Sequence, residues 1–122
     1  ELIKYSEKVI NKYFLEFWHK DVKVHKKLGL NRVQALNEEV VIYIDTDSCY
    51  VKFEEVLDKC DWNKSPKEFI QTIYKVFLKD YLKKCLEIFA EKSNTVNIQE
   101  FELENICDSG IWLGKKKYVY NP

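Results

Sequence analysis

The chain has 122 residues, of which 46% are apolar and 33% are charged, a composition typical of a soluble globular domain with one modest core. Its 20 basic and 20 acidic side chains cancel, which excludes a strongly basic nucleic-acid module. Any nucleic-acid contact has to come from a local cluster of positive charge. No apolar run approaches the roughly 20 residues that a membrane-spanning helix needs, so no membrane contact is expected.

The cysteines are widely spaced and form no C-x-x-C pair, which argues against a zinc site. Without a signal peptide, this spacing indicates reduced thiols in a cytoplasm rather than a disulfide framework. The sequence has no methionine, and both of its ends look cut from a larger pattern. We therefore expect a piece of a longer protein. The four cysteines are Cys49, Cys60, Cys85 and Cys107.

Apolar pairs recur at helical spacing through residues 1–20, which predicts a helix packed on a sheet. Residues 21–39 are rich in lysine and carry a turn signal at Leu28-Gly29-Leu30-Asn31. We expect a solvated connector there, with a phosphate-facing loop as the alternative.

Two runs of β-branched and aromatic residues flank an acidic centre in residues 40–53, VVIYIDTDSCYVKF. The runs predict two strands of a hairpin, and Asp45-Thr46-Asp47-Ser48 predicts the turn between them. Two carboxylates so close together at the edge of an apolar sheet need a partner, and a hard divalent cation is a natural one. The alternative is a plain turn, because Asp and Ser are ordinary turn formers. An EF-hand loop does not fit, since Tyr50 and Val56 stand where Gly and Glu are required.

A short helix is expected over 54–61 and a long one over 65–92. Ser65 can cap the long helix, Pro66 suits its first position, and Glu68 completes a capping box. The apolar spacing predicts that its buried stripe consists of Phe69, Ile70, Ile73, Val76, Phe77, Tyr81, Cys85, Ile88 and Phe89.

Alternating residues predict a strand pair over 95–120 with a turn at Asp108-Ser109-Gly110. We expect a bulge in the first strand before Phe101, which leaves Glu102 and Glu104 together on one face. On the second strand, alternation predicts a shared face for Trp112, Lys116, Tyr118 and Tyr120.

The order of helix, hairpin, helix and hairpin predicts a single domain of the α+β class over residues 1–122. We expect an antiparallel sheet of two hairpins, with two long helices packed on one of its faces. The run from Gly114 to Tyr118 contains three consecutive lysines. Exposed lysines on an edge strand commonly guard against aggregation, and the functional alternative is a strand that contacts phosphates.

In combination and in this order, two of these stretches resemble the palm of family B DNA polymerases. Tyr43-Ile44-Asp45-Thr46-Asp47-Ser48 is similar to the family's motif C, Y-G-D-T-D-S, and Lys115-Lys116-Lys117-Tyr118 is similar to its K-K-R-Y strand. The long helix and strand pair between them also follow the family's order, in a layout similar to that of T-even phage replicative polymerases. The resemblance covers roughly Val40 to Asn121.

The resemblance implies a DNA-directed DNA polymerase, a nucleotidyltransferase that uses two Mg²⁺ ions. Asp47 would be a direct metal ligand, and Asp45 would support the charge of the site beside it. The strand before the lysines carries acidic residues near the metals in T-even relatives. Of Glu102 and Glu104, which occupy it here, Glu104 is the better candidate ligand.

The same resemblance implies contacts with the primer end of a primer–template duplex. Lys116 and Tyr118 would reach the minor groove and a phosphate, and Lys115 would contribute from the same strand. The implied partners are primer–template DNA, a deoxynucleoside triphosphate and the remainder of the polymerase chain. The implied location is the cytoplasm, that of a bacterial host cell for a phage enzyme.

The sequence also departs from the family. Ile44 replaces the usual small residue before the first Asp, and no stretch resembles motif A, D-x-x-S-L-Y-P-S, or the K-x-x-x-N-S-x-Y-G motif that grips the triphosphate. We therefore expect a palm fragment that does not polymerise by itself. Two other classes stay open: a non-catalytic nucleic-acid-binding or scaffold domain with a polymerase-like fold, and an interaction domain with an incidental acidic turn.

Overall fold

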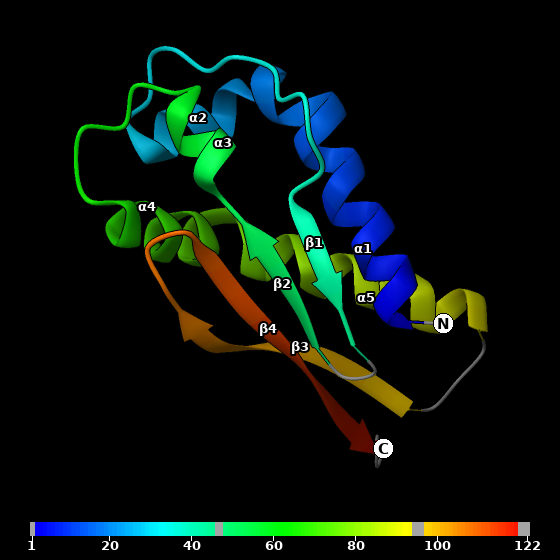
Figure 1. Ribbon diagram of the computed structural model, residues 1–122. Coiled ribbons are helices and arrows are strands. Elements are labelled where there is room, and N and C mark those ends of the chain that lie inside the picture. Colours follow the sequence, from blue (N-terminus) through cyan, green and yellow to red (C-terminus); the bar gives the residue numbers. More distant parts are fainter. Residues whose placement is uncertain (1, 46–47, 94–96, 120–122) are drawn as a thin grey trace.

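The structure, a computed structural model, describes the backbone of residues 2–45, 48–93 and 97–119 and the side chains of 3–45, 48–89, 91–92 and 101–114. Its elements are helices and four strands, with two π-helical turns (η1 and η3) and one 3₁₀ turn (η2) inside the helical segments (Figure 1). In chain order they are α1 (Leu2–Lys12), η1 (Tyr13–Phe17), η2 (Trp18–Lys20), α2 (Val22–Leu28), β1 (Val41–Ile44), β2 (Ser48–Lys52), α3 (Glu54–Asp58), α4 (Pro66–Ile73), η3 (Tyr74–Leu78), α5 (Lys79–Ser93), β3 (Asn97–Ile106) and β4 (Gly110–Val119).

The strands form one antiparallel sheet in the order β1-β2-β4-β3, which confirms the predicted α+β class. β2 pairs with β4 from Ser48↔Gly114 to Lys52↔Gly110. The last strand of the chain therefore lies inside the sheet, between β2 and β3, and joins the N-terminal strand pair to the C-terminal one.

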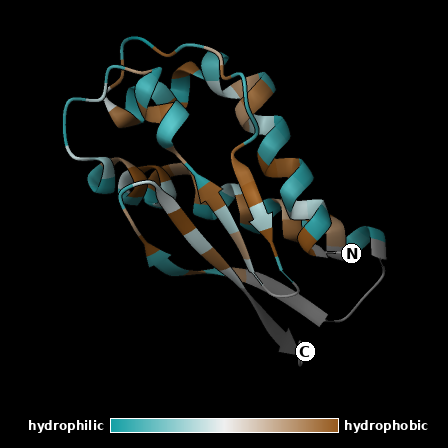
Figure 2. Ribbon diagram, viewed as in Figure 1, coloured by the Kyte–Doolittle hydropathy of each residue, from teal (hydrophilic) through white to brown (hydrophobic). Residues whose placement is uncertain are grey.

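The helices α1, α4 and α5 lie together on one side of the sheet (Figure 1), and contacts link α1 to β1 and α5 to β3. The strand residues that point toward them are fully buried, while their non-glycine neighbours on β2 and β4 are partly exposed, which is the alternation of an antiparallel sheet with one covered face. In Figure 2, α1 alternates between polar and apolar turns, as a helix with one buried side does. The buried strand residues are Cys49, Val51, Ile111 and Leu113, each 0% exposed.

Residues 21–39, predicted to be a solvated connector, are instead structured. Helix α2 begins where the Asp21 side chain accepts a hydrogen bond from the Val24 N–H (3.4 Å), and it ends at Gly29, whose φ of 72° is the left-handed conformation that glycine adopts readily. Both signals are in the sequence, but only the turn at Gly29 was predicted from it.

Acidic side chains from the α3 region hold the chain between α2 and β1. The Asp61 carboxylate accepts hydrogen bonds from the Asn31 and Arg32 N–H groups, at 3.0 and 3.1 Å. Glu55 accepts from the N–H groups of residues 37 and 38, at 2.9 and 3.0 Å. The hydrogen bond from Arg32 is the main cause that lowers the pKa of Asp61. Backbone donors in this stretch are therefore satisfied by protein rather than by solvent alone.

Asn11 of α1 ties the helix layer to the start of β1. Its side-chain oxygen accepts hydrogen bonds from the Val40 and Val41 N–H groups, at 2.9 and 2.8 Å, and its amide donates to Glu39 (3.2 Å). Asn11 is only 5% exposed. A buried amide with its donor and acceptor both used fixes the point at which β1 enters the sheet.

The buried stripe predicted for residues 65–92 is correct up to Ile73. Beyond it, Val76, Phe77 and Tyr81 are only partly buried against the core, and the fully buried positions lie one residue later. In η3 the Lys79 N–H donates to the Tyr74 carbonyl, five residues earlier rather than four. The extra residue rotates the rest of the helix by about 100°, so Ile88 is 46% exposed. The residues that are buried instead are Leu78, Leu82 and Leu86.

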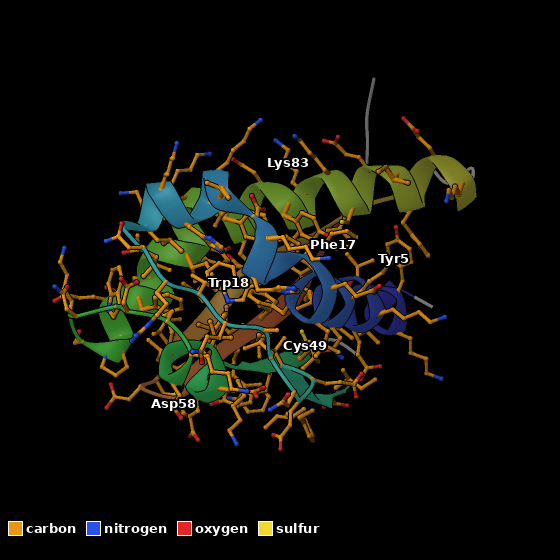
Figure 3. The ribbon with its side chains drawn as sticks, turned by 90° about the horizontal axis from the view of Figure 1, so that it is seen from above. Tyr5, Phe17, Trp18, Cys49, Asp58 and Lys83 are labelled. Carbon is orange, nitrogen blue, oxygen red and sulfur yellow. The ribbon has the colours of Figure 1, made fainter. Side chains whose placement is uncertain are left out.

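The first helix contains a similar turn, in which the Trp18 N–H donates to the Tyr13 carbonyl. The two π-helical turns meet, because the Tyr13 ring stacks on Phe77 with centroids 4.5 Å apart. Figure 3 shows Trp18 directed into the interior, where it is 0% exposed, whereas Phe17 is 50% exposed. The turns thus let two helices present their largest rings to one another and to the core.

The bulge predicted early in β3 lies further along the strand. The ladder with β4 is regular from Asn97 to Leu103, and the extra residue falls between Leu103 and Asn105. That residue is Glu104, and its side chain occupies the Cβ side of Gly114, the partner of Glu102. The two carboxylates therefore lie together on one face, as predicted. Among the described residues, no helix is both long and apolar enough to cross a membrane.

Candidate functional site

The acidic turn, Asp45–Ser48, follows β1 directly. Asp45 is exposed, and its N–H donates to the Ser48 carbonyl (2.8 Å), which closes the connection between β1 and β2. Asp47, the predicted metal ligand, lies outside the described residues. The chain therefore returns at Ser48 into the middle of the sheet, directly beside β4.

A row of paired residues leads from the acidic turn across the sheet. Ser48 pairs with Gly114 of β4, and Gly114 pairs with Glu102 of β3. The bulge brings a second carboxylate into this row, because the Glu104 side chain occupies the space that a Cβ on Gly114 would need. Glycine at position 114 thus makes room for the carboxyl group of Glu104 above β4.

The lysine-rich part of β4 continues this strand beyond Gly114. The backbone of Lys115, Lys116 and Tyr118 is paired with β3, at Phe101, Glu100 and Ile98 in turn. The side chains of these three predicted DNA-contacting residues lie outside the described part. The lysine-rich part of β4 begins at Lys115, one residue after Gly114, the partner of Ser48.

The described carboxylates do not by themselves make a metal site. Within the parts of the chain whose side chains are described, no group of three His, Cys, Asp or Glu side chains is arranged to hold an ion. Glu102 and Glu104 are both exposed. An oxygen-rich site here would need Asp47 and ligands from elsewhere in addition to Glu104.

Three aromatic side chains form a second row, next to the first, on the face of the sheet opposite the helices. This aromatic row consists of Tyr43, Tyr50 and Trp112, which are cross-strand neighbours on β1, β2 and β4. The ring centroids of Tyr43 and Trp112 are 5.6 Å apart, and those of Tyr50 and Trp112 are 4.9 Å apart. Both pairs have the tilted or edge-to-face geometry that aromatic rings prefer.

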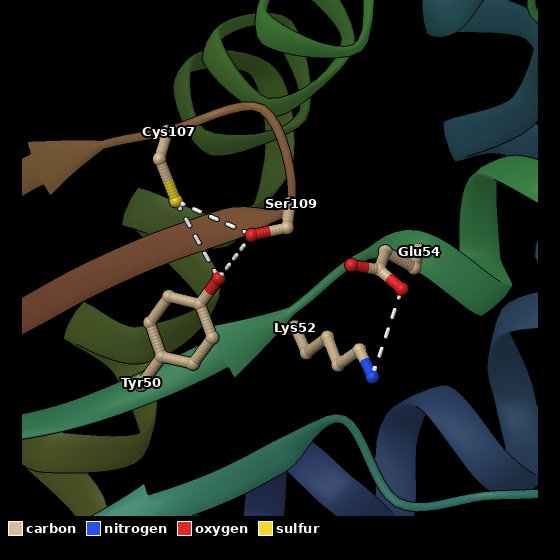
Figure 4. A network of polar contacts seen from close by, with 5 residues as sticks. All are labelled: Tyr50, Lys52, Glu54, Cys107 and Ser109. Carbon is tan, nitrogen blue, oxygen red and sulfur yellow. Dashed lines mark hydrogen bonds and ion pairs between the residues drawn. The ribbon is translucent and has the colours of Figure 1, made fainter.

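A polar network at the β3–β4 turn anchors Tyr50, the middle ring of the aromatic row (Figure 4). The Tyr50 hydroxyl lies 2.6 Å from the Ser109 hydroxyl and 3.4 Å from the Cys107 sulfur. The hydrogen bond from Ser109, followed by that from Tyr50, lowers the pKa of the Cys107 thiol to about 7. Burial is the main cause that raises the pKa of Tyr50. The hydroxyl of Tyr50 therefore stays protonated and holds its ring in place.

The thiol of Cys49 on β2 differs from that of Cys107 in both burial and pKa. Cys49 is 0% exposed on the helix side of β2. Burial raises the pKa of its thiol to about 12, and the negative charges of Glu7 and Glu104 add to the effect. Cys49 is therefore a neutral core residue.

Sequence reasoning identified the acidic turn and the lysine strand but missed the aromatic row and the Cys107 network. Alternation along β4 placed Trp112 on the same face as Lys116, which was a partial signal. The partners of Trp112 on β1 and β2 depend on the register between strands that are far apart in the sequence.

We compared the chain with protein-family models, with curated proteins and with solved structures, and none of the three comparisons gave a significant match.

Proposed function

We propose that the chain is part of the palm of a DNA-directed DNA polymerase of family B. The observation that carries the proposal is the register of β2 against β4, in which Ser48 of the acidic turn pairs with Gly114, the residue before Lys115. Two motifs far apart in the sequence therefore lie on adjacent strands of one antiparallel layer. A site that brings metal ions to a primer end requires this kind of juxtaposition.

The chain would supply part of a magnesium site. Asp47 and Glu104 would hold the ions, and Asp45 would support the negative charge of the site. The carboxyl group of Glu104 above Gly114 supports this role, because it projects over the strand that adjoins the acidic turn. When bound, the two ions would lower the pKa of the primer 3′-hydroxyl and neutralise charge on the triphosphate and the leaving pyrophosphate.

The site would be incomplete in this chain alone. Metal ions roughly 3.5–4 Å apart need bridging carboxylates from more than one element, and the sequence contains no motif A to supply them. Lys115, Lys116 and Tyr118 would hold the primer strand of a primer–template duplex through its phosphates and minor groove. The remaining ligands and the triphosphate contacts would come from the rest of a longer polymerase chain in the host cytoplasm.

Paramagnetic broadening by Mn²⁺ tests the metal role directly, since Mn²⁺ accepts the same oxygen ligands as Mg²⁺. In NMR spectra of this chain, millimolar Mn²⁺ is expected to broaden amide signals around Asp47, Glu104 and Gly114 first. Asp47→Asn and Glu104→Gln should each weaken that broadening, whereas Asp58→Asn, an exposed acidic residue on α3, should not. If tens of millimolar Mn²⁺ leave these signals unchanged, the proposal fails and an interaction domain with an incidental acidic turn is favoured.

Primer–template binding tests the lysine strand. Lys116→Ala should weaken binding of a short primer–template duplex and make the logarithm of the affinity fall less steeply with the logarithm of salt concentration, by about one unit of slope. Lys64→Ala is a matched control, because Lys64 is exposed near the start of α4 and lies over the Trp62 ring. An unchanged slope in Lys116→Ala would mean that this lysine only protects the strand from aggregation. The chain by itself is expected to give no template-dependent nucleotide incorporation.

A further inference from the structure

The aromatic row crosses three strands of the sheet and ends on the fourth. Tyr43 pairs with Tyr50, Tyr50 pairs with Trp112, and Trp112 pairs with Asn105 of β3. Strand neighbours in such a row are close enough for their side chains to form one continuous surface. The row therefore presents three rings and an exposed side-chain amide across the full width of the sheet.

The row is exposed and held in place. Tyr43 is 51% exposed, and the neighbouring Ile42 is 56% exposed because β1 is irregular between Val41 and Tyr43. The hydroxyl of Tyr50 is hydrogen-bonded to Ser109 at 2.6 Å, which fixes the centre of the row. The described helices contribute no cover, since they pack on the other face (Figure 1).

We propose that the aromatic row binds an unpaired DNA strand by stacking against its bases. A four-stranded antiparallel sheet with helices on one face and rings on the open face is a common platform for single strands, because every base has a π-face. The Asn105 amide has a donor and an acceptor that can pair with a base edge. The choice of DNA rests on the proposed polymerase function, but the row is separate from the carboxylates and lysines invoked there.

The described charge next to the aromatic row favours contact through bases rather than phosphates. Glu104 is exposed in the row next to the aromatic one, and a carboxylate repels phosphate groups nearby. Lys52, on the other side, is already paired with Glu54 at 3.7 Å (Figure 4). A strand that lies across the row therefore meets rings with its bases and keeps its phosphates toward solvent.

The test measures fluorescence anisotropy of a dye-labelled twelve-residue oligothymidylate with this chain, in EDTA and at low salt. Tyr43→Ala is expected to weaken binding at least about fivefold, the lower end for loss of one stacked base. Phe17→Ala is the matched control: Phe17 is 50% exposed, as Tyr43 is, but lies in the helix layer. It should leave the affinity within about twofold.

Variants at the centre of the row separate stacking from folding. Trp112→Ala should abolish binding more completely than Tyr43→Ala, but it removes a half-buried side chain, so its fold is checked by circular dichroism. Trp112→Phe keeps a ring and should retain affinity within about threefold while keeping the fold. Equal loss in Tyr43→Ala and Phe17→Ala, or no loss in either, overturns the proposal. A fivefold preference for the matching oligouridylate overturns the choice of DNA.

The outcome is independent of the metal test. EDTA removes divalent ions, so Asp47→Asn should leave oligothymidylate binding unchanged or slightly tighter, because a negative charge is lost. Loss of the Mn²⁺ effect with stacking intact would reject the polymerase proposal alone. Loss of stacking with the Mn²⁺ effect intact would reject the aromatic row alone.

Discussion

The two faces of the sheet are built from alternate residues of the same strands, yet they differ in burial and in the types of side chain that they carry. On β4, Ile111 and Leu113 are 0% exposed against the helices, while Trp112 between them lies on the open face beside Tyr50. Among the strand residues whose side chains are described, the covered face holds apolar side chains and a neutral thiol, and the open face holds rings and carboxylates, with an ionisable thiol at the β3–β4 turn. A shift of one residue in register would exchange the two sets, so the pairing of β2 with β4 fixes which residues form the core and which form the open face.

The largest expected contrast is in stability. Leu113→Ala removes a fully buried side chain and is expected to lower the free energy of unfolding by about 2–5 kcal/mol. Tyr43→Ala on the open face should cost less than about 1 kcal/mol, because half of the side chain is already in water. Urea denaturation followed by circular dichroism measures both. Comparable losses would mean that something covers the open face in solution.

The thiols of Cys49 and Cys107 allow the two faces of the sheet to be compared by their reactivity. With a thiol pKa of about 7, Cys107 should react with iodoacetamide at a rate that rises with pH and levels off above neutrality. Cys49 has a pKa of about 12 and is fully buried. It should react more than a hundredfold more slowly at pH 8, on the order expected from its small thiolate fraction.

Peptide mass spectrometry after timed alkylation gives both rates in one sample. Ser109→Ala removes the main hydrogen bond to Cys107 and should move the midpoint of its reactivity to higher pH. If that midpoint stays near 7, the hydrogen-bond network of Figure 4 does not control the thiol.

Substitution of the two glycines of β4 tests how well the open face accommodates an added Cβ atom. A Cβ at Gly110 would collide with the Val51 carbonyl and with the Tyr50 ring, so Gly110→Ala should cost about 1–3 kcal/mol. The atoms nearest to a Cβ at Gly114 would be those of the Glu104 side chain, which can move. Gly114→Ala should therefore cost less than about 1 kcal/mol, within the range of mild overpacking.

Gly114→Ala has a second expected effect, because it displaces the carboxyl group of Glu104. In the Mn²⁺ experiment it should weaken the broadening about as much as Glu104→Gln does. The double variant Gly114→Ala/Glu104→Ala should recover the stability lost in Gly114→Ala, since the collision is then absent. An additive loss would show that Glu104 does not fill this space.

The smallest expected effect is at the ion pair of Lys52 and Glu54. The two side chains are 41% and 59% exposed and 3.7 Å apart. Lys52→Ala should change the free energy of unfolding by less than about 0.5 kcal/mol, as exposed ion pairs usually do. The change should vanish at 1 M salt, and a larger or salt-independent change would point to packing by the aliphatic part of Lys52.

Features that depend on neighbouring residues in the sequence were predicted well. Ser65 accepts a hydrogen bond from the Glu68 N–H (3.2 Å), and Pro66 opens α4, as the capping signal indicated. The short helix after β2 and the turn before Gly110 are also local, and the structure has both. The Cys107 N–H donates to the Gly110 carbonyl (3.0 Å) across that turn.

Features that depend on distant partners were not predictable from one sequence. Asn11 looked like an ordinary polar helix residue, but its partners lie 28–30 positions away at the start of β1. The aromatic row needed the register of β2 with β4, which a pattern of alternation does not provide. The acidic turn and the lysine strand were recognisable because each is a contiguous motif, whereas their adjacency is a property of the folded sheet.

The π-helical turn at Tyr74–Leu78 has a consequence for how the long helix could have arisen. Its one extra residue separates two segments that each keep regular α-helical geometry, so the helix looks like a product of a single-codon insertion. Deleting one residue within the turn would turn α5 back by about 100°. Tyr81 and Cys85, which are half-buried now, would then turn further inward and Leu82 would turn outward, the arrangement that the uninterrupted sequence period favours. In the observed arrangement, the stacking of Tyr13 on Phe77 joins this turn to the π-helical turn of the first helix.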